Sequence, residues 1–235
     1  ISLTTNGAAA ATWTGLINSN GGDGEGTLNI QGTGGITFAS AVGKAGSGAL
    51  LLVNIDQAAT FDGAVEATNF TVDADSTFTG AVTANTAFTV AGATTDVTIT
   101  AASALGTLTA TAGSVTANGL ITTVNTVNTA GKIYLNVAEN EMGAGKYTAG
   151  DGAELHVGKA FVTTNNILIS DVSAGEGDFH SGSKIYLPSN LTSGETLKIT
   201  DAGAFDQGDA SKTAVTTAAA VQVTLQDTAL VDYSA

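Results

Sequence analysis

The chain lacks cysteine and arginine and contains a single proline. Without cysteine, neither disulfide bridges nor thiolate metal sites are available to it. Its seven basic residues are all lysines, against 21 acidic residues, and the formal net charge is -14. Binding to the phosphates of a nucleic acid requires clustered Lys or Arg side chains. The composition therefore argues against a nucleic-acid partner.

Charged residues and long apolar runs are also scarce. Charged residues make up 12% of the chain, against roughly 25% in an ordinary domain. The longest apolar run, Ala49–Val53, is strand-sized, whereas a membrane-spanning helix needs about 20 apolar residues. Hydrophobic residues reach 43%, which disfavours disorder. Ile1–Thr5 has no basic start typical of a signal peptide. We expect a folded chain without a transmembrane segment, either a mature product or a fragment of a precursor.

Small and β-branched residues are abundant instead. The chain has 40 Ala, 38 Thr and 30 Gly. Thr and Val lose rotamer freedom in helices. Segments such as Thr27–Ile30, Phe70–Val72 and Val97–Thr100 alternate apolar with polar residues, and Gly, Asn and Asp recur between such segments as turn formers. These features predict an all-β fold.

An internal repeat indicates how the strands are arranged. Thr60–Ala67 is similar to Thr77–Ala84, and Asn69–Val72 is similar to Ala87–Val90 at nearly the same offset. A looser and more distant copy, Thr37–Val42, precedes the first. A period that drifts in this way is typical of a parallel β-solenoid (β-helix) whose loops vary in length. In such a fold each turn adds strands in register about 4.8 Å from the previous turn.

The solenoid hypothesis also predicts which side chains face inward. Like residues then stack on like residues, as pairing within a sheet favours. The predicted core consists of Phe61, Val65, Phe70 and Val72, with Phe78, Val82, Phe88 and Val90 stacked over them.

Beyond about residue 131 the composition changes. Gly131–Leu135 is similar to the later segment Ser183–Leu187, and Pro188 follows the second copy. Proline cannot donate to a strand ladder and marks a strand end or a sheet edge. We predict two sections: solenoid repeats over residues 1–130, and a second β section over residues 131–235. The second section is either a looser continuation of the solenoid or a separate β-sandwich.

These repeats resemble a known family. Gly34–Phe38, Ala41–Gly43, Leu52–Ile55, Thr60–Val65 and Ile185–Leu197 are similar to the repetitive passengers of bacterial autotransporter-type surface adhesins and surface-layer proteins. The resemblance implies an extracellular parallel β-helix exposed on the bacterial cell surface, with a role in adhesion or in a protective coat. It covers roughly residues 27–200.

The ends of a solenoid are open sheet edges, which must be capped or paired. Both ends of this chain are strand-like, and we expect self-association into a filament or surface lattice through their apolar residues. The candidate assembly edges are Ile1, Leu3, Val221, Val223 and Leu225. Host or surface glycans and proteins are the other expected partners.

Two acidic loops are candidate calcium sites. Gly21–Leu28 resembles the calcium-binding nonapeptide of β-helix repeats, although Gly26 replaces its essential Asp. The candidate ligands are Asp23 and Glu25 in this loop, and Asp201, Asp206 and Asp209 in the second. No other cofactor is expected.

Nothing in the sequence marks a catalytic nucleophile. The chain has two histidines, His156 and His180. His180 follows Glu176 and Asp178 in an acidic loop, and no G-x-S-x-G elbow is present. We therefore expect a protein that is not an enzyme.

The enzymatic alternative is a carbohydrate-binding or carbohydrate-cleaving β-helix. Cleavage would require paired carboxylates at a defined separation, for which Asp56, Asp62, Asp73 and Asp75 are the candidates. Asp73 and Asp75 are better explained as turn-capping residues. A third alternative is ice binding through Thr-x-Thr segments such as Thr98–Thr100, but their spacing along the chain is irregular.

Overall fold

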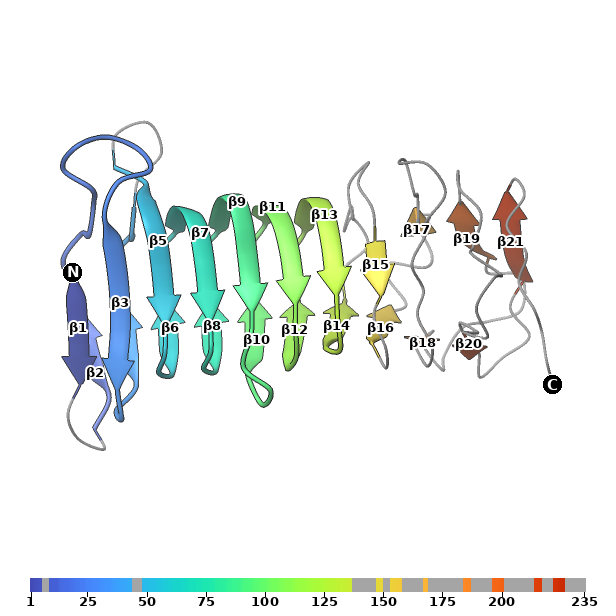
Figure 1. The fold of residues 1–235 in the computed structure, drawn as a ribbon, viewed down its shortest axis with the longest axis horizontal. Helices are drawn as coiled ribbons and strands as arrows, with labels where there is room; N and C mark the ends of the chain where they lie inside the picture. The colour runs from blue at the N-terminus through green and yellow to red at the C-terminus, as the bar shows by residue number, and fades with distance from the viewer. Residues whose placement is uncertain are drawn as a thin grey trace.

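The computed structural model describes residues 1–5, 9–43, 48–136, 147–149 and 153–157, together with five short strands nearer the C-terminus. Every regular element in these residues is a β-strand, and every strand pairing among them is parallel (Figure 1). Successive strands of the first turns alternate between two sheets, so that each turn of the chain contributes one strand to each sheet. The prediction of an all-β parallel solenoid is confirmed.

Three sheets contain the described strands. Sheet A is formed by β1 (Ser2–Thr5), β3 (Thr27–Gly32), β5 (Leu50–Ile55), β7 (Val65–Val72), β9 (Val82–Val90), β11 (Ser103–Ala110), β13 (Ile121–Asn128) and β15 (Tyr147–Ala149). Sheet B is formed by β2 (Ala11–Trp13), β4 (Ile36–Phe38), β6 (Ala59–Phe61), β8 (Ser76–Phe78), β10 (Asp96–Ile99), β12 (Ser114–Ala117), β14 (Lys132–Leu135), β16 (Glu154–Val157), β18 (Lys184–Tyr186) and β20 (Ala214–Thr216). Sheet C is formed by β17 (Ile167–Leu168), β19 (Thr196–Thr200) and β21 (Gln222–Gln226).

The sequence repeats pair with one another in the predicted register. Phe38 pairs with Phe61, and Phe61 with Phe78, at the offsets found between the sequence repeats. Phe70 pairs with Phe88 in the same way. The rings of Phe38, Phe61 and Phe78 stack with centroids 4.8 Å apart and planes within 8°. This spacing equals the usual distance between neighbouring strands, about 4.8 Å, so one ring occupies each turn.

All eight predicted core residues are buried. The alternation of buried and exposed positions along β7 breaks at Thr68 and Asn69, which are both half-buried. The pairing with β9 is irregular at the same place. The long strands of sheet A therefore turn a corner, and their two halves together with the sheet B strand surround a narrow interior.

Glycines allow two neighbouring turns to approach closely where the chain leaves sheet B. A Cβ on Gly80 would lie 2.3 Å from the carbonyl carbon and oxygen of Gly63, and one on Gly63 would lie 2.5 Å from the carbonyl carbon of Ser40. No side chain fits at those distances. The repeated Gly-Ala-Val of the sequence is explained by this stacked corner.

Parallel pairing in sheet B continues past residue 131. β12 pairs with β14, and β14 with β16. The similar segments that begin at Gly131 and Ser183 contribute β14 and β18, which flank β16 on its two sides, so that Ile133 and Ile185 both pair with Leu155. The division into sections at residues 130 and 131 stays a prediction, and Pro188 lies outside the described residues.

Candidate functional site

A continuous column of threonines covers the outer face of sheet B. From β4 to β12 the residues on either side of this Thr are buried. The Thr therefore points outward, since side chains alternate across a strand. Successive register partners place one Thr on each of six neighbouring strands. This Thr column consists of Thr12, Thr37, Thr60, Thr77, Thr98 and Thr116.

The column is regular in space but irregular in sequence. The stretch of chain from Thr12 to Thr37 is longer than the stretch from Thr60 to Thr77. The loops at the corners absorb these differences in length, and the strands keep their register. A search of the sequence for a fixed interval misses the column. Aligning the chain on the core residues Phe38, Phe61 and Phe78 reveals it, because each follows a Thr directly.

Thr-x-Thr pairs occur on three of the six strands of this column. Thr12, Thr77 and Thr98 are followed two residues later by Thr14, Thr79 and Thr100. The equivalent positions on the neighbouring strands are occupied by Ala39, Asp62 and Asn118. A flat two-column threonine array, the feature expected of an ice-binding surface, therefore extends over no more than two adjacent turns of the described column.

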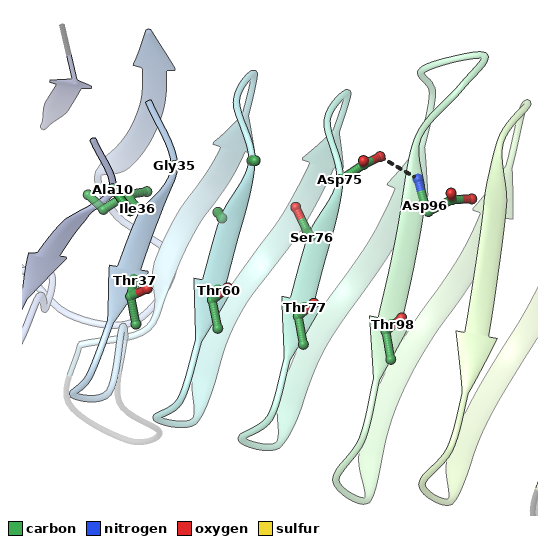
Figure 2. A pocket seen from close by; sticks show the side chains of 12 residues that line it. Ala10, Gly35, Ile36, Thr37, Thr60, Asp75, Ser76, Thr77, Asp96 and Thr98 are labelled. Carbon is green, nitrogen blue, oxygen red and sulfur yellow. Dashed lines mark hydrogen bonds between the residues drawn. The ribbon is translucent and has the colours of Figure 1, made fainter. Parts of the chain in front are cut away.

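A shallow groove of about 400 Å³ runs along the Thr column. Figure 2 shows Thr37, Thr60, Thr77 and Thr98 in a row along it. In the part of the chain that the structure describes, none of these four hydroxyls makes a hydrogen bond with protein. All four threonines are at least partly exposed, and all four line the groove. They can therefore donate and accept hydrogen bonds at regular intervals along the solenoid axis.

Two carboxylates on adjacent strands border the groove. Asp75 and Asp96 directly precede Ser76 and Val97, which pair in the sheet. The amide of Asp96 donates to Oδ1 of Asp75 at 2.9 Å (Figure 2). Oδ1 of Asp96 accepts from the Ser114 hydroxyl. Like charges on neighbouring strands are destabilising. No Lys, Arg or His is among the described residues that line the groove, so its potential is negative.

The same outward column continues with aromatic residues. Thr116 pairs with Tyr134, which pairs with His156, which in turn pairs with Tyr186. The rings of Tyr134 and His156 are stacked, with centroids 4.4 Å apart and planes at 22°. These two ring faces cover each other, so this part of the column presents edges rather than open faces to a ligand.

An ion-pair cluster flanks the aromatic rings. Oε2 of Glu154 lies 3.4 Å from Nζ of Lys132 and 2.9 Å from Nε2 of His156. Burial alone would raise the pKa of the Glu154 carboxyl, but the hydrogen bond with His156 and the charge of Lys132 outweigh it. The pKa of Glu154 therefore lies below its usual value. By register, Lys184 follows Glu154 on the next strand.

The first predicted calcium loop is held by hydrogen bonds. Oδ1 of Asp23 accepts from the amides of Gly48 and Ala49 at 2.7 and 2.9 Å, and the Glu25 side chain lies over Gly21. Among the described residues, no three His, Cys, Asp or Glu side chains come close enough to hold a metal ion. The second group of candidate ligands, Asp201, Asp206 and Asp209, lies outside the described residues. Calcium binding stays a prediction.

The candidate catalytic carboxylates lie in three places. Asp56 and Asp73 follow Ile55 and Val72, which pair in sheet A, and Asp56 accepts from the Asn54 side chain at 3.0 Å. Asp62 follows the sheet B strand β6, whereas Asp75 precedes the neighbouring sheet B strand β8. The turn between β7 and β8 contains Asp73 and Asp75, as the turn-capping interpretation predicts. The acids are therefore spread over three columns, and His180 lies outside the described residues.

The predicted assembly residues at the N-terminal end lie on the first strand of sheet A or directly before it. Leu3 belongs to β1 and packs against the core, while Ile1 precedes β1 with 65% of its surface exposed. Val223 and Leu225 belong to β21, the last strand of sheet C. Val221 lies outside the described residues. Assembly through these strands stays a prediction.

Comparison with family models finds no match, and comparisons with curated proteins and with solved structures find none either. Within the described residues, no helix is long and apolar enough to cross a membrane. The solenoid and its surface therefore carry the evidence for function.

Proposed function

We propose that this chain is a structural and adhesive element of an extracellular bacterial surface, as in the autotransporter passengers and surface-layer proteins that its repeats resemble. The observation that supports this most is the parallel pairing of each turn with the next, with like residues paired from β4 to β9. In such an array each turn contacts only its neighbours, and length is added without altering the fold. A rod of this kind separates two surfaces while presenting one repeated face.

The interior supports a mechanical role. Stacked Phe rings occupy successive turns, and glycine corners bring neighbouring turns into backbone contact. Close-packed interiors of this kind resist deformation and local opening. Each backbone ladder also shields the amides of the turn beneath it. We expect a stiff rod that resists proteases over the described turns.

Adhesion is tested by displaying the chain on a bacterial cell and measuring attachment to glass and to cultured epithelial cells under flow. The matched control is the variant Phe61→Asp, which places an unpaired charge in the stacked core and breaks the rod. We expect the native chain to increase attachment several-fold over this variant at equal surface density. Equal attachment of the two would overturn the proposal.

Self-association is the second part of the proposal. Sedimentation velocity and negative-stain electron microscopy, each with calcium and with chelator, measure it directly. Ordered filaments or sheets are the expected result, and their loss in chelator would assign calcium a role in the contact. A monodisperse monomer at high concentration under both conditions would remove self-association from the proposed function.

A further inference from the structure

We propose that the groove over the Thr column binds an extended, uncharged, hydroxyl-rich glycan that lies along the solenoid axis. Glycan binding deepens the proposed adhesive function, on which it rests, because it gives the chemistry of the partner and the surface that holds it. The binding residues are Thr37, Thr60, Thr77 and Thr98, with Asp75 and Asp96 at the rim.

The periodicity of the Thr hydroxyls favours a ligand that repeats along its length. Four hydroxyls lie on successive strands, about 4.8 Å apart, and none is bonded to protein within the described residues. A hydroxyl both donates and accepts. A ligand that matches this row must therefore carry a donor and an acceptor in each unit. An extended glycan has these properties, since each sugar unit carries hydroxyls and its length is similar to the spacing of the strands.

The charge of the rim favours a ligand that donates hydrogen bonds. The Asp75 and Asp96 carboxylates only accept, and within the described residues the second oxygen of each makes no hydrogen bond with protein. Sugar hydroxyls can donate to them. No cation among the lining residues offsets the two charges. Uronates, sulfated glycans and nucleic acids are repelled from this groove for the same reason.

The groove has none of the anchors of a tight protein interface. Such interfaces are centred on aromatic or Arg side chains in desolvated pockets. None of the described residues that line this groove is aromatic or Arg. Its apolar members are small residues and the buried Ile36. The site therefore offers many weak polar contacts in a row. One net hydrogen bond contributes only about 0.5–1.5 kcal/mol, so binding gains strength when a long polymer engages several rods at once.

The experiment is isothermal titration of the full chain with cellohexaose, maltohexaose and a hexamer of N-acetylglucosamine, and with a heparin hexasaccharide as the anionic probe. The test variant is Thr60→Val with Thr77→Val, which replaces two hydroxyls by methyl groups of the same shape. The control variant is Thr71→Val with Thr89→Val, the equivalent outward register pair on sheet A. Circular dichroism and thermal melting verify that all three proteins are folded alike.

We expect at least one neutral hexamer to bind in the millimolar range and heparin not to bind. The Thr60→Val, Thr77→Val variant should bind about tenfold more weakly, the effect of two lost hydrogen bonds, and the sheet A variant should bind as the native chain does. Equal weakening in both variants would place the glycan elsewhere, and binding of heparin alone would contradict a negative groove. Both outcomes overturn the inference.

The adhesion assay separates this inference from the function on which it rests. Attachment of displayed rods that persists while no neutral hexamer binds would overturn the glycan groove and leave adhesion standing. Loss of attachment on Thr60→Val with Thr77→Val, but not on the sheet A pair, supports both together.

Discussion

The interior of the solenoid differs between two groups of turns that share one backbone. In the aromatic turns (residues 59–90) the inward columns contain Phe61 and Phe78 in sheet B and Phe70 and Phe88 in sheet A. In the small-residue turns (residues 103–135) the same columns contain Ala117, Leu135, Leu108 and Thr126. The strands remain parallel and in register throughout. Register is thus carried by the backbone ladders, while the side chains decide how firmly each turn is packed.

The small-residue turns replace apolar volume by internal hydrogen bonds. The hydroxyls of Thr123 and Thr126 bond each other at 3.0 Å in the buried interior. Asn128, fully buried, accepts from the amide of Gly131 at 2.9 Å and donates to the carbonyl of Glu154 at 3.1 Å. Buried polar groups are tolerated when they are satisfied in this way. The two regions should therefore fail differently when mutated.

The largest effect is expected in the aromatic turns. Phe78→Ala leaves a cavity between Phe61 and the edges of Phe70 and Phe88, and should lower the free energy of unfolding by about 3–5 kcal/mol. Urea denaturation measures it. The control is Thr77→Ala, the outward neighbour, for which a change within about 0.5 kcal/mol is expected. Similar losses for the two variants would show that the stacked rings are not the main source of stability.

The next effect belongs to the small-residue turns. Asn128→Ala leaves the Gly131 amide and the Glu154 carbonyl without their partner, which should cost about 1–3 kcal/mol. Hydrogen exchange should accelerate at β13 and β14 while the amides of β7 and β9 keep their protection. Asn136→Ala removes a side-chain hydrogen bond to Asn118 at the surface and serves as control. Uniform loss of protection along the whole rod would contradict the separation of the two regions.

A smaller effect sharpens the comparison further. Thr126→Val alone leaves the Thr123 hydroxyl buried without its partner and should cost about 1 kcal/mol. Thr123→Val with Thr126→Val replaces both hydroxyls by apolar groups of the same shape, and should restore or exceed native stability. A double-mutant cycle in urea measures this coupling. If the losses in the free energy of unfolding are additive, the hydroxyl pair stabilises the fold more than two apolar side chains of the same shape would.

The smallest effect is electrostatic and lies next to the small-residue turns, where Glu154 on β16 pairs with Lys132 on β14. Because the pKa of Glu154 is lowered in the fold, the carboxylate adds stability above its unfolded pKa, about 4.3, and this stability is lost as pH falls through the lowered pKa. Glu154→Gln should therefore cost less than about 1 kcal/mol near neutral pH, and the cost should vanish in acid. Lys132→Met should reduce the same pH dependence. Unfolding curves from neutral pH into acid measure both, and a cost for Glu154→Gln that is independent of pH would contradict this assignment.

Much of the fold could be predicted because aromatic residues mark the register. Phe61 and Phe78, or Phe70 and Phe88, are conspicuous in the sequence, and stacking them fixes the offset of their turns. In the small-residue turns this marker is missing, because Ala, Thr and Asn occur at inward and outward positions alike. Nothing in the sequence distinguishes the buried Asn128 from a turn asparagine.

The groove was harder to predict than the core for a related reason. The outward Thr residues, such as Thr60, Thr77 and Thr98, are among the most common residues of the chain, and their intervals vary with the loops. The adjacency of Asp75 and Asp96 depends on the loop between β9 and β10, which lengthens that turn relative to the one before it. The calcium loops were predicted from local spacing alone, which does not reveal that the Asp23 carboxylate already accepts a hydrogen bond from the amide of Gly48.

The short reach of each pairing has a consequence for how the chain acquires its shape. Phe61 pairs with Phe78 one turn later in the chain. Every described pairing within sheets A and B joins strands that follow one another in the same sheet. Because each turn pairs only with its neighbours, folding can begin at one place and propagate along the rod. The aromatic turns can form first, and each later turn can then pair with the open strand edges of the turn before it.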